Sequence, residues 1–184
     1  MIGSKIETSK QLETAVLGAG CFWCTEAVYQ RIKGVKEVVS GYTGGHTKYP
    51  SYEDIVKGGT GHIEVAKITF DPDVISYPKL LDYFWIMHDP TSMDQQGSDK
   101  GEQYRSAIFY LTEKQKEDAL KSKEILDRSG MYQNKAVTEV LPLQEFYEAE
   151  DYHKNYYDNN KNSLYCRLVI EPKLNKLSLD EKDR

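Results

Sequence analysis

The sequence predicts an α+β protein of one domain, in which helices pack against a single mixed β-sheet. Three observations support this class. Short apolar segments suited to strands interleave with segments of helical periodicity, their order is mixed, and the chain has no internal repeat or low-complexity stretch. A length of 184 residues fits one domain and is enough to bury a sizeable core.

In the N-terminal half, the apolar segment 13–19 ends in glycines and predicts a strand. Apolar residues at helical spacing then predict a helix over 22–32, followed by a strand over 35–41. A glycine-rich loop at 41–50 and a short helix near 52–57 come next. The alternating segment 62–70 predicts a strand, which Asp71-Pro72 closes.

In the C-terminal half, one apolar face predicts a helix over 77–88, and a polar loop follows at 89–102. A strand at 105–111 leads to Thr112, which with Gln115 predicts a capping box for a helix to about residue 129. Two further strands are predicted, at 136–141 and 164–170. The polar start, 1–12, is expected to be loosely ordered, and 175–184 to form a charged tail.

Composition narrows the classes of function. The formal net charge is -5 with both signs interspersed, which argues against nucleic-acid binding. There is no apolar run of membrane-spanning length and no signal peptide, so we expect a cytoplasmic protein without a membrane segment. Three cysteines, an odd number in a chain of this length, indicate reduced or catalytic thiols rather than a disulfide framework.

Cys21 lies at the junction between the first predicted strand and the first predicted helix. A thiol at a helix N-terminus faces unpaired backbone N–H groups, and these donors and the helix dipole favour the thiolate. We therefore expect a lowered pKa at Cys21, and a nucleophile at neutral pH.

The spacing Cys21-x-x-Cys24 brings two sulfurs to the start of that helix, and four interpretations apply. A structural zinc site needs further ligands at paired spacing, which are absent from the sequence. Two inert buried cysteines and a thioredoxin-like disulfide exchanger are the next alternatives. We favour a nucleophilic Cys21 with Cys24 as helper or bystander, because other candidate site residues lie downstream.

Glu64 shares a strand face with the apolar side chains of Ala66, Ile68 and Phe70. Burial would raise the pKa of this carboxyl and keep it protonated near neutral pH, so that it can donate a proton. The alternative is a carboxylate at a frayed strand end, paired with a nearby lysine. The pattern does not decide between these two interpretations.

Several aromatic residues and one histidine are weaker candidates. Tyr52 adjoins the predicted loop 41–50, and Tyr104 adjoins the predicted loop 89–102. In either place a phenol could donate a hydrogen bond to a neutral oxygen, although packing is the commoner role of a tyrosine. Phe22 and Trp23 could form a pocket for a small apolar group or belong to the core. His88 is more consistent with a core histidine than with a general base.

Five motifs spaced along the chain resemble those of a known family. They are Gly20-Cys21-Phe22-Trp23, Gly41-Tyr42-Thr43-Gly44-Gly45, Thr60-Gly61-His62-Ile63-Glu64-Val65, His88-Asp89-Pro90-Thr91 and Gln103-Tyr104-Arg105-Ser106. In this order they resemble the A-type peptide methionine sulfoxide reductases, over residues 13–174. The resemblance implies that this range is the reductase domain, folded as a ferredoxin-like α/β plait.

The resemblance also implies roles for individual residues. Cys21 would be the nucleophile, Glu64 the acid, and Asp99 a further acid of the site. Tyr52 and Tyr104 would donate to the sulfoxide oxygen, and the methyl pocket would be made by Phe22 and Trp23. The family forms a sulfenic acid, condenses it to a disulfide, is reset by thioredoxin, and acts on the S epimer. No bound cofactor or metal is implied.

The resemblance does not decide which thiol is the resolving one, the thiol that condenses with the sulfenic acid. Cys24 is close to Cys21 through the chain, whereas Cys166 corresponds to a tail cysteine of the family. We favour Cys24, because 164–170 is predicted as a strand and not as a mobile tail. Two departures, Asp94-Gln95-Gln96-Gly97 and Tyr49-Pro50-Ser51, affect substrate contacts at most and remove no catalytic group.

The hypothesis from the sequence is a monomeric, cytoplasmic repair enzyme that reduces methionine S-sulfoxide, free and in oxidised proteins, by thiol chemistry. A general thiol-disulfide oxidoreductase built on Cys21 and Cys24 is the alternative enzyme, and it would not need Glu64. A non-enzymatic module that binds partners through its tyrosine-rich loops is a third class, and it would not need Cys21.

Overall fold

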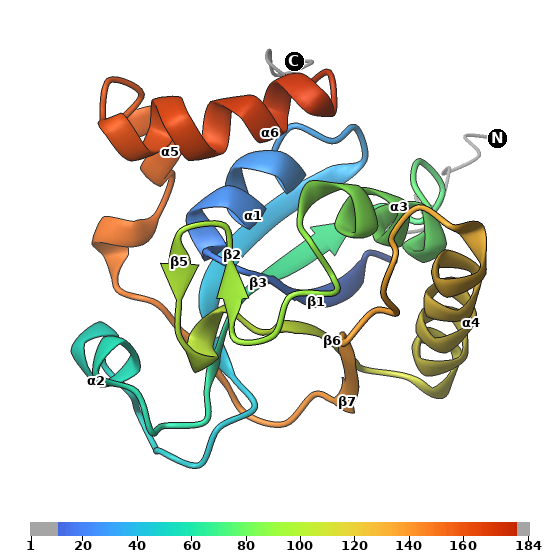
Figure 1. The fold of residues 1–184 in the computed structure, drawn as a ribbon, viewed down its shortest axis with the longest axis horizontal. Coiled ribbons are helices and arrows are strands. Elements are labelled where there is room, and N and C mark those ends of the chain that lie inside the picture. The colour runs from blue at the N-terminus through green and yellow to red at the C-terminus, as the bar shows by residue number, and fades with distance from the viewer. Residues whose placement is uncertain (1–10, 180–184) are drawn as a thin grey trace, which may run out of the picture.

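A six-stranded sheet forms the centre of the computed structural model, which describes residues 11–179 (Figure 1). The strand order is β7-β6-β1-β3-β2-β8. Its middle four strands pair antiparallel, and they are connected as β1-α1-β2-β3-α3-β6. This connection and order are those of a ferredoxin-like plait, so the predicted fold class is confirmed.

In the first two thirds of the chain, the helices and strands occur in the predicted order and close to the predicted residue ranges. The strands are β1 (Glu13–Ala19), β2 (Val35–Thr43), β3 (Ile63–Phe70), β4 (Gln95–Gln96), β5 (Asp99–Lys100), β6 (Ser106–Tyr110), β7 (Glu139–Pro142) and β8 (Phe146–Glu148). The helices are α1 (Phe22–Tyr29), α2 (Tyr52–Lys57), α3 (Tyr77–Met87), α4 (Glu113–Ser129), α5 (Tyr156–Asn159) and α6 (Glu171–Lys176). Short 3-10 turns occur at Glu102–Tyr104 and Asp151–His153, and a π-helical turn at Cys166–Ile170.

The main core lies between one face of the sheet and helices α1 and α3. Leu17, Ala66 and Ile68 point from the strands into this core, as the period of two predicts. The opposite face carries Val16 and Val65 and is covered by apolar side chains of the segment 141–146. Among residues 11–179, no helix is both long and apolar enough to cross a membrane.

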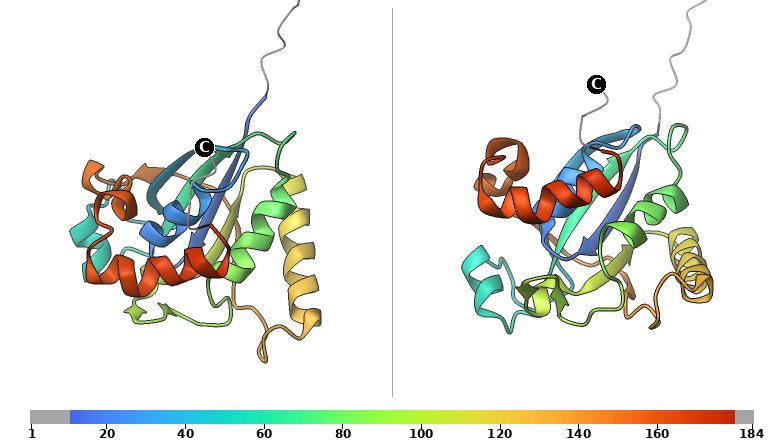
Figure 2. Two further views of the ribbon diagram at one scale, coloured as in Figure 1. Left: turned by 90° about the horizontal axis from the view of Figure 1, so that it is seen from above. Right: turned by 45° about the horizontal axis from the view of Figure 1, so that its top comes forward.

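The C-terminal segment crosses the outer side of α1, so that residues far apart in the sequence lie side by side (Figures 1 and 2). Helices α5 and α6 and the π-helical turn between them all contact α1. Helix α1 is consequently buried from both sides, by the sheet beneath and by this segment above.

The predicted strand at 164–170 is wrong, because this stretch is helical. Cys166, Ile170 and Leu174 are buried, whereas Leu164 and Leu168 are exposed. Buried residues four apart are typical of a helix, and the β-branched pair Val169-Ile170 suggested a strand only locally. The segment is still not a mobile tail, since one of its faces is part of the main core.

The cap predicted for α4 is confirmed in part. The Thr112 hydroxyl accepts a hydrogen bond from the Gln115 N–H, but the Gln115 side chain accepts one from the N–H of Leu111 and not from that of Thr112. The predicted loose segment and charged tail lie mostly outside the described residues, since the structure describes nothing before residue 11 or after residue 179.

Gly20 makes the turn that carries the chain from β1 into α1. Its φ is +88°, and a Cβ at this position would lie 2.7 Å from Cγ of Gln96. Both the left-handed backbone and the close approach therefore require glycine immediately before Cys21.

We expect Gly20→Ala to lower the free energy of unfolding by about 2–5 kcal/mol, from backbone strain and overpacking together. Urea denaturation measures the change. Gly130→Ala is the control, because Gly130 has a φ of +73° but no atom within 4 Å of its ideal Cβ. The control should lose only about 1–2 kcal/mol, and equal losses in the two variants would show that the contact with Gln96 contributes nothing.

Candidate active site

Cys21 occupies the N-cap position of α1, where its side chain makes no capping hydrogen bond. The backbone oxygen of Cys21 instead accepts the N–H of Cys24 at 3.1 Å, which starts the helix. The first free N–H of the helix, that of Phe22, donates to Oε2 of Glu64 at 3.0 Å. A carboxyl group from β3 therefore caps the helix and lies beside the thiol.

Glu64 is a buried, largely neutral acid. Only 2% of its surface is exposed, so the interpretation of a carboxylate at a frayed strand end is wrong. Burial raises the pKa of Glu64 to about 8; the hydrogen bond from Phe22 opposes this shift, and the negative charge of Asp99 adds to it. At neutral pH this side chain can both accept from the Phe22 N–H and donate a proton.

The expected low pKa of Cys21 is wrong for this structure. Burial raises the pKa of the Cys21 thiol well above its ordinary value, and the contact with Cys24 and the charge of Glu64 act in the same direction. The helix N-terminus does not outweigh this burial. The hydrogen bond from the Cys21 thiol lowers the pKa of Cys24, so the two sulfurs interact directly.

The two predicted phenols lie close to the same groups. Tyr52 is the first residue of α2, whose N-cap Ser51 forms a capping box with Asp54. Burial first, and then the charges of Glu64 and Cys21, raise the pKa of Tyr52 to about 12. The pKa of Tyr104 is raised by the same causes. Both hydroxyls therefore stay protonated at neutral pH and remain able to donate hydrogen bonds.

Asp99 approaches the thiols from the short β4–β5 hairpin. Its Oδ2 accepts a hydrogen bond of 2.7 Å from the hydroxyl of Tyr165, and that hydroxyl lies 3.7 Å from Sγ of Cys24. Because Tyr165 donates its only hydroxyl proton to Asp99, its oxygen is left to accept from the Cys24 thiol. Tyr165 was not predicted as a site residue, and only its place beside Cys166, which corresponds to a tail cysteine of the family, pointed to it.

Trp23 is held at the site by residues about 130 positions later in the chain. Its indole N–H donates to Nδ1 of His153 at 3.0 Å, and its ring stacks on Tyr156 with centroids 3.7 Å apart. Glu150 accepts from the Tyr52 N–H and the Tyr42 hydroxyl. Neither His153 nor Glu150 was predicted as a site residue, because no local pattern shows which distant partner each of them meets.

The other three candidate residues, Phe22, Cys166 and His88, are all buried. Phe22 is buried against Tyr42 and His153, so its ring belongs to the aromatic core behind Trp23. Cys166 is fully buried in the π-helical turn. His88 bonds through its two ring nitrogens to the Phe84 carbonyl and the Ser106 hydroxyl, and burial lowers its pKa to about 3. It is a core histidine, as the sequence favoured.

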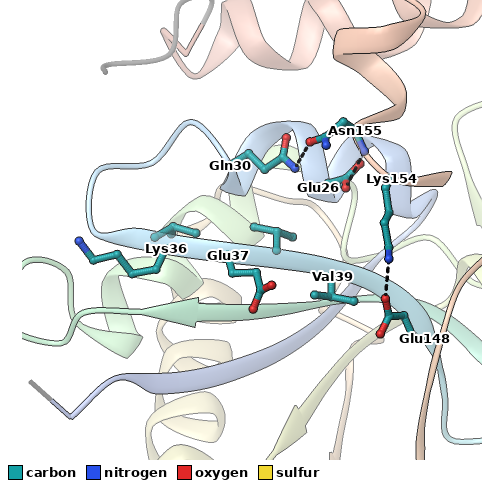
Figure 3. A pocket seen from close by; sticks show the side chains of 10 residues that line it. Glu26, Gln30, Lys36, Glu37, Val39, Glu148, Lys154 and Asn155 are labelled. Atoms are coloured by element: carbon teal, nitrogen blue, oxygen red, sulfur yellow. Dashed lines mark hydrogen bonds and ion pairs between the residues drawn. The ribbon is translucent and has the colours of Figure 1, made fainter. Parts of the chain in front are cut away.

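Two hollows lie near α1, but only one of them reaches the sulfurs. A groove of about 440 Å³ runs along β2 and is crossed by an ion pair of 2.9 Å between Lys154 and Glu148 (Figure 3). None of the predicted site residues lines this groove. A cavity of about 360 Å³ is lined by both Cys21 and Cys24, together with Asp99. All three cysteines are unpaired.

The site combines the Cys21 thiol with a neighbouring neutral acid, a second thiol and two protonated phenols. Within residues 11–179, no group of three or more His, Cys, Asp and Glu side chains is arranged to hold a metal ion. The fold and this site define a thiol oxidoreductase.

Comparison with known proteins identifies the family. The family model described as peptide methionine sulfoxide reductase matches residues 13–184. The protein named peptide methionine sulfoxide reductase MsrA from Sulfolobus acidocaldarius is 50% identical over 173 residues, covering 94% of this chain and 97% of its own. The chain therefore belongs to the peptide methionine sulfoxide reductase family, and it is an oxidoreductase that reduces methionine sulfoxide.

Solved structures of the same family share the fold. Mxr1 from Saccharomyces cerevisiae in its reduced form aligns with a TM-score of 0.80 at 33% identity, covering 88% of this chain and 92% of Mxr1. A structure of Mxr1 in complex with Trx2 aligns with a TM-score of 0.56 at 25% identity, covering 82% of this chain and 91% of that one.

The raised pKa of Glu64 predicts a dependence of stability on pH. The folded state holds the Glu64 proton up to about pH 8, whereas the unfolded chain releases it near its ordinary value of about 4.3. Between these values the folded state binds more protons, so its stability falls by up to about 1.4 kcal/mol per pH unit as the pH rises.

The variant Glu64→Gln should not lose stability in this way as the pH rises, because glutamine does not ionise. Its amide oxygen can still accept the hydrogen bond from the Phe22 N–H. Urea denaturation at pH 5 and at pH 8 tests the prediction: the wild type should lose stability relative to Glu64→Gln between these values. Parallel behaviour of the two proteins would contradict the burial of a protonated Glu64.

Proposed function

We propose that this reductase acts on the S epimer of methionine sulfoxide, free and in oxidised proteins, with Cys21 as nucleophile and Glu64 as acid. The single observation that carries the assignment is the bond of 3.0 Å from the Phe22 N–H to Glu64. It holds a protonated carboxyl next to the sulfur of the preceding residue. A thiol-disulfide exchanger has no need of such an acid.

The proposed first step transfers the sulfoxide oxygen to Cys21. The Cys21 sulfur attacks the sulfoxide sulfur while Glu64 donates its proton to the oxygen, which makes the oxygen a better leaving group. The sulfur–oxygen bond of the substrate then breaks while the hydroxyl bonds to the Cys21 sulfur. The transient bond between the two sulfurs breaks with its electron pair going to methionine, which leaves, and Cys21 is left as a sulfenic acid. The thiol proton of Cys21 restores Glu64, so the step needs no external proton.

The surrounding residues would hold the substrate. Tyr52 and Tyr104 donate hydrogen bonds to the sulfoxide oxygen and keep their protons, as their raised pKa values support. Trp23, with Phe22 behind it, contacts the methyl group. Asp99 raises the pKa of Glu64 through its charge and so favours the protonated acid. Thiols and a carboxylic acid supply all of this chemistry, so we propose no bound cofactor.

Cys24 is the proposed resolving thiol. It lies one helical turn from Cys21, and its pKa is lowered chiefly by the hydrogen bond from the Cys21 thiol. Its sulfur attacks the sulfenic sulfur of Cys21, a disulfide forms, and the hydroxyl leaves as water with the Cys24 proton. Cys166 is the alternative, and what argues against it is that, unlike Cys24, it does not line the cavity that Cys21 lines.

The external reductant is proposed to be thioredoxin or another dithiol. The family relative Mxr1 has been captured with the thioredoxin Trx2, which supports this class of partner. We further propose that the protein works as a monomer in the cytoplasm, where dithiol reductants are kept reduced.

The first test is single-turnover reduction of the two epimers of methionine sulfoxide without any reductant. The S epimer alone should yield methionine, and Cys21→Ser should yield none. Because Glu64 must be protonated, the rate should fall as the pH rises through about 8, the value to which burial raises the pKa of Glu64.

The variant Glu64→Gln should lower the rate of methionine formation by about 10²–10⁴-fold and abolish this loss at high pH. Glu64→Asp is the matched control, since it keeps a carboxylic acid and should retain part of the rate and its pH dependence. If Glu64→Gln reacts like the wild type, the protein is a general thiol-disulfide oxidoreductase and the proposal fails.

The second test identifies the resolving thiol by mapping the product of the same single turnover. Wild type and Cys166→Ser should both form a Cys21–Cys24 disulfide, whereas Cys24→Ser should stop at the sulfenic acid, which dimedone traps. The matched pair of serine variants keeps side-chain size nearly constant. A disulfide between Cys21 and Cys166 in the wild type would reverse the assignment.

A further inference from the structure

The cavity that reaches the two active-site sulfurs is separate from the groups proposed to hold the sulfoxide. Its volume is about 360 Å³, and its lining includes Cys21, Cys24, Asp99, Leu168, Val169 and Lys173. Glu64, Tyr52, Tyr104 and Trp23 do not line it. The cavity therefore approaches the thiols from the side of the C-terminal segment and the β4–β5 hairpin.

The rim of this cavity carries an unusual pair of apolar side chains. Leu168 is 66% exposed and Val169 is half-buried, and both belong to the π-helical turn Cys166–Ile170. Such turns are rare and are frequent at functional sites. An exposed leucine is ordinary on a protein surface, but this one lies at an opening that leads to two reactive sulfurs.

Lys173 places one positive charge on the wall of the cavity, opposite in sign to an incoming thiolate, beside the carboxylate of Asp99. Nζ of Lys173 donates to the Met87 carbonyl at 2.8 Å, which fixes its ammonium group on the cavity wall. After the hydrogen bond from Cys21, the charge of Lys173 is the next cause that lowers the pKa of Cys24. The same ammonium would attract a thiolate from outside and stabilise the thiolate that a broken disulfide releases.

We propose that this cavity is the docking site of the protein dithiol that resets the enzyme, and that Leu168 is an apolar contact of that partner. The inference rests on the proposed function, which forms a Cys21–Cys24 disulfide at the base of the cavity. The partner must carry a thiol, because a disulfide is reduced by thiol-disulfide exchange. If that thiol lies on a protein, the protein surface around it can cover Leu168 and Val169.

The redox step is an ordinary thiol-disulfide exchange. A thiolate of the partner attacks one sulfur of the Cys21–Cys24 disulfide, whose bond breaks as the other sulfur leaves with the electron pair. The second thiolate of the partner then attacks the mixed disulfide and releases the remaining enzyme thiolate. The enzyme gains two electrons and, after protonation, two protons, while the partner becomes a disulfide.

The experiment compares Leu168→Gln with Leu164→Gln, each in the full chain. Leu164 is the matched control, since it is 71% exposed, precedes Leu168 by one helical turn and does not line the cavity. Turnover of methionine S-sulfoxide is measured with thioredoxin and its reductase, and again with dithiothreitol, a small dithiol that needs no docking surface. Glutamine removes the apolar contact without adding a charge near the thiols.

We expect Leu168→Gln to lower kcat/KM for thioredoxin about tenfold, which corresponds to about 1.4 kcal/mol. Turnover with dithiothreitol should be unchanged, and Leu164→Gln should match the wild type in both assays. Equal thioredoxin kinetics in the wild type and Leu168→Gln, or equal losses in the two variants, would overturn the inference.

Two further outcomes separate this inference from its alternatives. If Leu168→Gln raises KM for an oxidised peptide in the dithiothreitol assay, the cavity binds substrate and the inference is wrong. The proposed function itself fails separately, when the wild type produces no methionine in a single turnover without reductant.

Discussion

The hydrogen bond from the Phe22 N–H to Glu64 is the constraint on which the rest of the site depends. It joins the start of α1 to β3 and satisfies a backbone donor that the side chain of Cys21 leaves without a cap. It also keeps a carboxyl group out of water, and burial then raises the pKa of Glu64 to about 8. One contact therefore begins the helix and positions the acid beside the thiol, while burial keeps that acid protonated against the opposing effect of the same hydrogen bond.

This arrangement bears on the proposed role of Cys21 as the nucleophile. A helix N-terminus in water would favour the Cys21 thiolate, but burial and a nearby carboxyl raise the pKa of Cys21 instead. A thiol and a protonated acid then coexist, and the proton lost by one can replace the proton given by the other. In the proposed mechanism both groups stay neutral until the sulfoxide arrives, which avoids two like charges in one buried site.

The C-terminal segment completes the site from the other side of α1. His153 orients the indole of Trp23, Tyr156 stacks on it, and Tyr165 connects Cys24 to Asp99. The same segment supplies Leu168 and Lys173 to the cavity above the sulfurs. Substrate and reductant would thus meet the thiol pair over different surfaces of one helix.

The sequence by itself determined the α+β class, and its motifs carried the family resemblance that supplied the plait and the proposed reacting groups. Periodicity located β1, α1, β3 and α3, because each of these elements buries one face of regular spacing. The position of Cys21 before a helix and of Glu64 on an apolar strand face also followed from local pattern. The helical segment at Leu164–Ile170 was missed, since a short run of β-branched residues fits a strand equally well until its burial is known.

Only the tertiary structure decided the protonation states and the outer shell of the site. The pKa of Cys21 depends chiefly on its burial, which no local pattern contains. The contacts of His153, Glu150 and Tyr165 join residues 66 to 141 positions apart in the chain. Such contacts follow from how α1 is covered on both sides, whereas sequence spacing predicts only what neighbouring residues share.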